Sequence, residues 1–323
     1  MIETITESIR SEINLFEERL ECALQSDIAL IHQVARYLAG TKGKRFRPVL
    51  AILSARAVGA MSDRVIDAAV ALELIHVASL IHDDIIDSSD RRRGVPTINK
   101  IWGDRISVLM GDFLFSRSLA ILVALRSNRV MKTISETAER LSAGEILEIQ
   151  MSMAQDVREE TYFQMISDKS ASLMSAACEV GAVLSRASSR EVDRMGRFGE
   201  TLGLAFQITD DLLDFVGDSD MLGKPVGIDI REKKVTLPLI RALSQSDNGE
   251  SRRIRSMIEK ESESPVDWQE IVGFVTRHKG VEYARKIARR YASSASEYIR
   301  DLGDSKAKTA LRKVIHHAVE RER

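Results

Sequence analysis

The residues best suited to chemistry are two aspartate triplets with the same spacing, Asp-Asp-x-x-Asp. They are Asp83, Asp84 and Asp87, and Asp210, Asp211 and Asp214. On a helix, positions i and i+4 lie about 40° apart, so the first and last aspartate of each triplet share a face. Carboxylates stacked on one face repel each other unless a cation lies between them. A hard divalent cation such as Mg²⁺, which also binds substrate phosphate, fits this pattern.

The triplets fit a solvated helix end, an EF-hand or a di-iron bundle less well. A solvated helix end would account for one triplet, but a second copy, also placed after an apolar segment, favours a shared function. The aspartate spacing does not match an EF-hand, and the glycine of that loop is missing. A di-iron bundle needs two Glu-x-x-His pairs, whereas the chain has only Glu73 with His76. His76 lies seven residues before Asp83, on the same helix face, which favours contact with a ligand over a plain core position.

Basic residues accompany the triplets along the chain. Three consecutive arginines, followed by Gly94, come after the first triplet and could bind a diphosphate: Arg91, Arg92 and Arg93. A second basic group precedes Pro48, at an expected helix start that favours anions: Lys44, Arg45 and Arg47. Single lysines are more often solvated than bound to a ligand, and they include Lys169, Lys224, Lys233 and Lys234. No P-loop pattern is present, so a P-loop NTPase is excluded.

The elements that position these residues are predicted to be helices. Only five prolines occur and aromatic residues make up 5% of the chain, which favours an all-α fold. Residues 63–87 lack Gly and Pro and predict a long buried helix that ends at the first triplet. We expect the other helices in the first segment and at 48–59, 104–126, 128–153, 159–185, 190–216, 235–245, 251–261, 267–277, 280–301 and 305–320.

The expected organisation is a single all-α domain over residues 1–323, with about ten to thirteen helices around a central cavity. The longest irregular stretch is the loop from Gly217 to Lys234. The polar segment from Ser244 to Pro265 is the best candidate for a subdomain joint.

Composition limits partners and location. The net charge of −1 excludes a whole-protein basic field for nucleic acid. The N-terminal segment lacks the apolar core of a signal peptide. The apolar stretch from Ile106 to Leu125 contains Asp112 and Arg117, so we expect a buried helix there and not a membrane span. Only two cysteines occur, which suits a reducing compartment and predicts a cytoplasmic location.

In this ordered set of motifs the chain resembles the trans-isoprenyl diphosphate synthase family, including its long-chain members, over nearly its whole length. The matching motifs are Gly-Lys-Arg-Phe-Arg-Pro at 43–48, Glu73 with His76, both aspartate triplets, Arg-Arg-Gly-x-Pro-Thr at 92–97, Gly111-Asp112, Lys169, Gln207 and Gly223-Lys224-Pro225. The resemblance implies an all-α isoprenoid synthase fold that condenses isopentenyl diphosphate with an allylic diphosphate, such as farnesyl or geranyl diphosphate.

The resemblance also implies residue roles. Asp83 and Asp87 would hold two Mg²⁺ ions and Asp210 a third from across the cavity, about three ions in all, supported by Asp84, Asp211 and Asp214. The allylic diphosphate would bind Arg92, Lys169, Lys224 and Lys234. Isopentenyl diphosphate would bind Lys44, Arg47, His76 and Arg93. Gln207 and Ser170 would lie near the developing carbocation. Ser170 stands where the family commonly has Thr, and Lys233, in the loop before Lys234, stands where many relatives carry Gly.

Product length follows from helix geometry. The product would grow along the helix face beneath Asp83, where Ala78 and Ser79 lie one turn below. Short-chain members of the family commonly block this level with aromatic residues. Because both residues here are small, we expect a long all-trans product of about six to ten isoprene units (about C30 to C50), with about eight as the best value, for a quinone side chain. The predicted tunnel floor is the helix that contains Phe115, Leu119 and Leu122.

Three alternatives remain open. They are a shorter-chain geranylgeranyl or farnesyl diphosphate synthase, a class I terpene cyclase, and a non-catalytic subunit of a heteromeric synthase. Retention of both triplets argues against a non-catalytic subunit, and the second basic group argues against a cyclase. By resemblance we also expect a homodimer joined near residues 104–126, no nucleic-acid partner, and transient membrane association for release of the apolar product.

Overall fold

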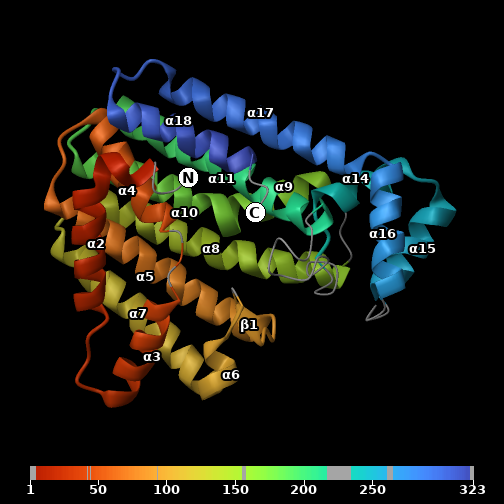
Figure 1. The fold of residues 1–323 in the computed structure, drawn as a ribbon, viewed down its shortest axis with the longest axis horizontal. Helices are drawn as coiled ribbons and strands as arrows, with labels where there is room; N and C mark the ends of the chain where they lie inside the picture. Colours follow the sequence, from red (N-terminus) through yellow and green to blue (C-terminus); the bar gives the residue numbers. More distant parts are fainter. Residues whose placement is uncertain are drawn as a thin grey trace. The chain divides into compact units, whose positions relative to one another are not determined.

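The structure is a computed structural model that describes residues 5–41, 43, 45–92, 94–154, 158–216, 234–259 and 265–320. These residues are almost entirely helical (Figure 1), which confirms the predicted all-α fold. The strands in this part of the chain are β1 (Arg91–Arg92) and β2 (Val95–Pro96), which pair antiparallel. This short hairpin follows the first triplet and carries two of the arginines noted above, Arg91 and Arg92.

The described residues group into two compact units. The first unit comprises Met1–Thr137, Leu173–Gly199 and Glu297–Val314, and the second comprises Ala138–Ser172, Glu200–Ser296 and Ile315–Arg323. The predicted joint at Ser244–Pro265 is wrong, because this segment lies wholly inside the second unit and contains a helix. Single-domain organisation stays a prediction.

The first unit is built around the long helix that carries the first triplet. Its elements are η1 (Glu7–Ile9), α2 (Arg10–Ala23), α3 (Ala29–Gly40), α4 (Phe46–Val58), α5 (Asp63–Ile86), α6 (Ile98–Trp102), α7 (Asp104–Ala124) and α10 (Ser172–Leu184), with parts of α8 (Asn128–Ala154), α11 (Ser189–Val216), α17 (Gly280–Arg300) and α18 (Lys306–Val319). Helix α5 is buried along most of its length, as its apolar composition predicts. A Cβ at Gly111 of α7 would lie 2.1 Å from Nε2 of His82, so the absence of a side chain at Gly111 leaves room for the imidazole of α5 where it now lies.

The second unit has its own hydrophobic core. Besides the remaining parts of α8, α11 and the last helices, it contains α9 (Glu159–Ile166), the π-helical turn η2 (Ser167–Ala171), α14 (Leu237–Gln245), α15 (Asn248–Glu259) and α16 (Pro265–Arg277). The core gathers Tyr162, Ile208, Phe215, Leu239 and Phe274, all of which are buried. The single helix expected over residues 159–185 is therefore interrupted by a π-helical turn.

Within the described ranges, two helices are long and apolar enough to span a membrane by length and composition alone, α5 and α7. In α5, 67% of the most apolar window is buried within the protein, and in α7 33%. Core helices of soluble proteins meet the same criterion, so these two helices are weak evidence for a membrane span.

Candidate functional site

The first aspartate triplet lies where α5 ends. Asp84 is buried, and its Oδ1 accepts a hydrogen bond from Nε of Arg92 on β1 at 2.7 Å. The backbone carbonyl of Asp84 accepts from the N–H of Ser89 at 2.9 Å, which ties the chain after the helix to its last turn. Asp83 and Asp87 are half-buried, and the Asp87 N–H donates to the Asp83 carbonyl at 2.8 Å. The middle carboxylate is thus anchored within the protein, while the outer two stay accessible.

A buried ion pair fixes the basic segment that enters α4. Arg45 has a left-handed backbone, with φ of 50°, and its carbonyl accepts the N–H of Val49 in the first turn of α4. Its guanidinium donates to Glu73 at 2.8 Å and to Glu17 at 3.1 Å. Burial lowers the pKa of Arg45, but the attraction and hydrogen bonds of Glu73 and Glu17 together outweigh it, so the net pKa is raised. The segment therefore has a defined anchor beside Arg47, whereas Lys44 lies outside the described residues.

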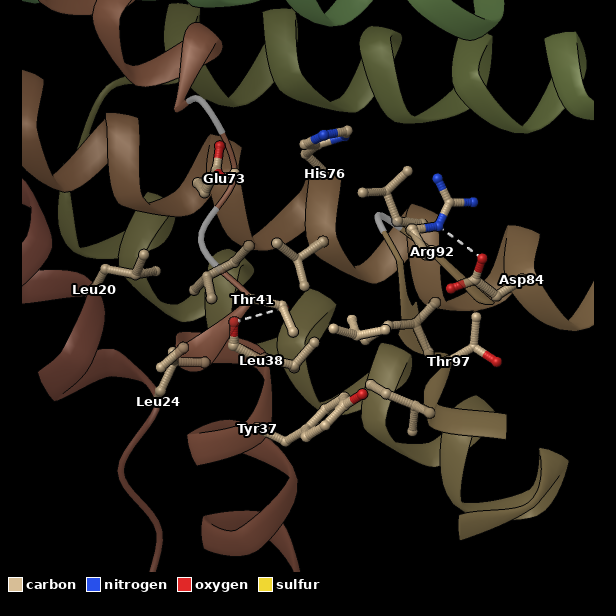
Figure 2. A pocket seen from close by; sticks show the side chains of 18 of the residues that line it. Leu20, Leu24, Tyr37, Leu38, Thr41, Glu73, His76, Asp84, Arg92 and Thr97 are labelled. Carbon is tan, nitrogen blue, oxygen red and sulfur yellow. Dashed lines mark hydrogen bonds and ion pairs between the residues drawn. The ribbon is translucent and has the colours of Figure 1, made fainter. Parts of the chain in front are cut away.

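A cavity of about 100 Å³ lies between α2, α3, α5 and the hairpin. Figure 2 shows Glu73, His76 and Arg92 toward the top of this cavity, and Leu24 and Tyr37 toward the bottom. The hydroxyl of Tyr37 donates to the Pro96 carbonyl at 2.6 Å, which ties α3 to the hairpin. Apolar walls with ionisable groups at one side suit a small molecule that has a polar head and an apolar body.

The second triplet lies in the last turns of α11. Asp211 is buried, and it accepts a hydrogen bond from the hydroxyl of Tyr162 at 2.6 Å and from Nε2 of Gln207 at 2.8 Å. Burial raises the pKa of Asp211 to about 7, although both hydrogen bonds lower it; the negative charges of Asp210 and Glu148 add to the rise. Asp210 and Asp214 are half-buried, like the outer aspartates of the first triplet.

Lys169 lies on the π-helical turn η2 and is paired with two carboxylates of α8. Its Nζ lies 2.5 Å from Oε2 of Glu148 and 2.8 Å from Oε2 of Glu145. Nζ of Lys234 lies 3.9 Å from the same Glu148 oxygen. Ser170 is half-buried next to Lys169. Two of the lysines predicted to bind the allylic diphosphate thus gather at one carboxylate.

The residues predicted to set product length differ in environment. Ala78 is 3% exposed, and the hydroxyl of Ser79 donates to the His76 carbonyl at 3.0 Å. On α7, Leu122 is fully buried and Phe115 is half-buried, but Leu119 is 37% exposed. The three α7 residues therefore do not form one buried surface within the chain, and their role as a tunnel floor stays a prediction.

The structure brings together several of the predicted residues. In the first unit His76, Asp84 and Arg92 line one cavity, and in the second unit Gln207 contacts Asp211 while Lys169 and Lys234 approach Glu148. Arg93, Lys224 and Lys233 lie outside the described residues, as does most of the loop from Gly217 to Lys234. The prediction missed Tyr162, Glu145 and Glu148. Tyr162 lies 49 positions from Asp211 and Glu148 lies 21 positions from Lys169, so only the fold brings these pairs together. The one signal in the sequence is that Glu145 and Glu148 lie one helical turn apart.

The residues of the triplets have the chemistry that a hard divalent cation requires. Within the ranges that the structure describes, no group of three or more His, Cys, Asp or Glu side chains forms a complete metal site. Mg²⁺ does not need one, because it takes one or two carboxylates and completes its shell with water and substrate phosphate. The half-buried outer carboxylates, Asp83 with Asp87 and Asp210 with Asp214, fit that pattern.

Known proteins resemble the chain along its whole length. Among curated relatives, it is 36% identical over 300 residues to octaprenyl diphosphate synthase of Escherichia coli, covering 93% of both chains. It is 34% identical to a short chain isoprenyl diphosphate synthase of Methanothermobacter thermautotrophicus, covering 98% of this chain and 99% of the relative.

Solved structures agree with these relatives. A decaprenyl diphosphate synthase from Rhodobacter capsulatus matches with a TM-score of 0.94 and 33% identity over 100% of both chains. A polyprenyl synthase from Caulobacter crescentus, complexed with calcium and isoprenyl diphosphate, matches with a TM-score of 0.94 and 31% identity, covering 100% of this chain and 98% of the other. The family described as Polyprenyl synthetase matches residues 28–275. The chain therefore belongs to the polyprenyl synthetase family and is a prenyltransferase that makes trans-prenyl diphosphates.

Proposed function

We propose that the enzyme makes a long all-trans polyprenyl diphosphate of about six to ten isoprene units, and most simply about eight, by adding isopentenyl diphosphate to farnesyl or geranyl diphosphate. The observation that carries this proposal is the small size of Ala78 and Ser79, one helical turn before Asp83. A long-chain product suits the side chain of a respiratory quinone. The relatives include both long-chain and short-chain synthases, so they support the type of reaction but not a particular chain length.

The expected chain length rests on helix geometry. A product that starts at the first triplet and extends along α5 meets the residues four and five positions earlier after about one turn, or 5.4 Å. Ala78 is buried and Ser79 is half-buried, so their side chains occupy interior space without filling it as an aromatic ring would. A ring at this level would stop growth after a few units.

Product chromatography of Ala78→Phe tests the proposal. We expect the wild type to yield about six to ten units and Ala78→Phe to yield shorter products, with Ser79→Phe as a second variant in case the buried site rejects the ring. Ala60→Phe is the matched control, because Ala60 is exposed between α4 and α5. A wild type that stops at farnesyl or geranylgeranyl diphosphate would show a short-chain synthase instead. Unchanged product length in both variants would also contradict a tunnel that passes these residues.

The proposed roles of the described residues follow the charge that the reaction creates. Breaking the allylic C–O bond leaves a diphosphate and an allylic carbocation, and Arg92, Lys169 and Lys234 would bind the diphosphate. Gln207 and Ser170 would lie near the carbocation. Arg47 and His76 would hold isopentenyl diphosphate, whose double bond attacks the cation before a proton is lost to the released diphosphate. Asp83, Asp87 and Asp210 would hold about three Mg²⁺ ions, which supply further stabilisation of the leaving charge.

An incorporation assay separates this enzyme from the alternatives of another class. Incubation with Mg²⁺, farnesyl diphosphate and labelled isopentenyl diphosphate should give labelled long-chain product from the purified chain alone. A cyclised hydrocarbon without label would show a terpene cyclase. Activity only after addition of another subunit would show a heteromeric synthase.

We also propose a homodimer joined through α7. Four exposed apolar side chains on this helix support an interface: Val108, Leu109, Leu119 and Val123 are 37–63% exposed. Analytical ultracentrifugation of Leu109→Glu and Val123→Glu should show loss of the dimer. A cytoplasmic location, with brief membrane contact for product release, suits the two free cysteines, and fractionation of cells tests it.

A further inference from the structure

The backbone that carries Lys169 is fixed against α8. A Cβ at Gly144 would lie 2.5 Å from the backbone nitrogen of Lys169. The π-helical turn therefore approaches α8 more closely than a residue with a side chain at position 144 would allow. One turn earlier on α8, Arg140 donates to Asp168 at 2.6 Å and to the hydroxyl of Ser167 at 2.8 Å. Single turns of π-helix occur often at functional sites. The backbone at Lys169 and at the two residues before it is therefore held against α8.

The ammonium group of Lys169 is held by two carboxylates at once. Glu145 and Glu148 lie one turn apart on α8, and each contacts Nζ within hydrogen-bond distance. All three side chains are less than 20% exposed. Burial lowers the pKa of Lys169, but attraction to Glu148 and Glu145 outweighs it and the net pKa is raised, so the ammonium stays charged.

This arrangement leaves one N–H donor of the Lys169 ammonium for a ligand. An ammonium has three N–H donors, and two of them meet Glu145 and Glu148. No third acceptor for Nζ is found in the part of the chain that the structure describes. The two carboxylates thus fix the direction in which the third N–H of Lys169 points, and this N–H can donate to one oxygen of an anion.

The same carboxylates cancel the charge of the lysines. Lys169 with Glu145 and Glu148 carries a net charge of −1, and Lys234, near Glu148, brings the sum of these described groups to zero. A free diphosphate carries several negative charges and gains little from a neutral group whose two carboxylates are half-buried. A diphosphate that is already bound to a divalent cation brings its own compensating charge.

We propose that Glu145 and Glu148 are positioning residues that aim Lys169 and make its site selective for the metal-complexed diphosphate over the free diphosphate. The proposal rests on the proposed function, in which Lys169 binds the allylic diphosphate. It gives the two glutamates a role in substrate selection: they keep free diphosphate, a product of the reaction, from occupying the site without metal.

Calorimetric titration with inorganic diphosphate, in Mg²⁺ and in EDTA, tests the proposal on the full chain. In EDTA, Glu148→Gln and Glu145→Gln should each bind diphosphate about tenfold more tightly than the wild type, because one opposing charge is lost. In Mg²⁺ the affinity should change by less than about threefold. Glu139→Gln is the matched control, since Glu139 is exposed on the same helix. Equal binding in EDTA by the wild type and both variants would overturn the proposal.

Kinetics and a double variant separate this proposal from the proposed function. Glu148→Asp keeps the charge but draws the carboxylate back, so it should retain the metal requirement while kcat falls and KM stays nearly constant. Adding Lys169→Met to Glu148→Gln should remove the gain of binding in EDTA. Full turnover by Lys169→Met alone would contradict the role of Lys169 itself. Loss of turnover by Lys169→Met, with no effect of Glu148→Gln in EDTA, would contradict only the role of the glutamates. Circular dichroism melts show whether each variant is folded.

Discussion

The two aspartate triplets have the same spacing but different surroundings. In both, the middle aspartate is buried and the outer two are half-buried. In the first triplet the buried Asp84 is neutralised by a cation, Arg92. In the second, Asp211 accepts hydrogen bonds from two uncharged donors, Tyr162 and Gln207, and burial raises its pKa to about 7. The same motif thus holds its buried middle carboxyl group in two different ways.

The difference lies in what stabilises the buried middle aspartate of each triplet. A buried carboxylate needs either an opposite charge or protonation, because desolvation penalises the charged form. Arg92 supplies the charge at the first triplet and also belongs to the hairpin that follows it, so the helix end and the hairpin are held together. Asp211 lies inside α11, where hydrogen bonds from neutral groups orient it. Substitutions in and around the two triplets test whether the two middle aspartates are stabilised differently.

The largest effect is expected for the outer aspartates, where the two triplets should behave alike. Asp83→Asn and Asp210→Asn should each lower kcat by about 10²–10³, because each removes a carboxylate proposed to hold the metal that stabilises the leaving diphosphate. The unfolding midpoint should move little, since both side chains are half-buried. Steady-state incorporation of isopentenyl diphosphate and urea titrations measure the two quantities. Near-normal kcat in one variant would show that only one triplet serves the reaction.

The middle aspartate of the first triplet should mainly affect stability. Asp84→Asn leaves the Arg92 guanidinium without its carboxylate, and we expect a loss of about 1–3 kcal/mol in the free energy of unfolding, toward the lower end because Arg92 is 35% exposed. Urea unfolding at pH 8 measures it. Asp90→Asn is the control, because Asp90 pairs with Lys100 at the surface and should change stability by less than about 1 kcal/mol. Equal losses in the two variants would contradict the anchoring role of Asp84.

The sequence predicted which residues share a face but not which partners they would meet. The spacing of each triplet and the apolar segments before it predict helices, and the structure has Asp83, Asp210 and Asp214 on helices. Asp87, also expected within the first helix, is instead the residue that caps its C-terminal end. The partner of Asp84 lies eight positions away, within a basic group that the sequence singled out. Tyr162 lies 49 positions from Asp211, and only the packing of the second unit brings it there.

The π-helical turn could not be predicted from the sequence either. Residues 159–185 have the apolar periodicity of one continuous helix, and periodicity does not reveal a single wider turn. At this turn the backbone of Lys169 packs on Gly144, and this contact joins segments 25 residues apart. The fold class follows from local composition, whereas the geometry of the predicted site depends on contacts between distant segments.

The hydroxyl of Tyr162 should have a moderate effect. Tyr162→Phe removes one of the two neutral donors to Asp211, and we expect a loss of about 0.5–1.5 kcal/mol in the free energy of unfolding at pH 5. Since this hydrogen bond lowers the pKa of Asp211, the variant should also hold its proton to a higher pH. Tyr298→Phe, on α17, is a control of the same chemistry. No change in stability at either pH 5 or pH 8 would show that the hydroxyl does not support the carboxyl group.

The smallest change at acid pH is expected for Asp211→Asn. The folded-state pKa of about 7 lies above the ordinary value of 3.8, so the folded protein binds the extra proton, and its stability falls as pH rises from about 4 through 7. At pH 5 the neutral acid and the amide each offer an acceptor and a donor to the same partners, so the two proteins should differ by less than about 1 kcal/mol. At pH 8 the variant should be the more stable in EDTA, because it has no buried charge. Urea titrations at both pH values measure the difference. A difference that does not depend on pH would contradict the raised pKa of Asp211, because it would mean that Asp211 is already ionised at pH 5.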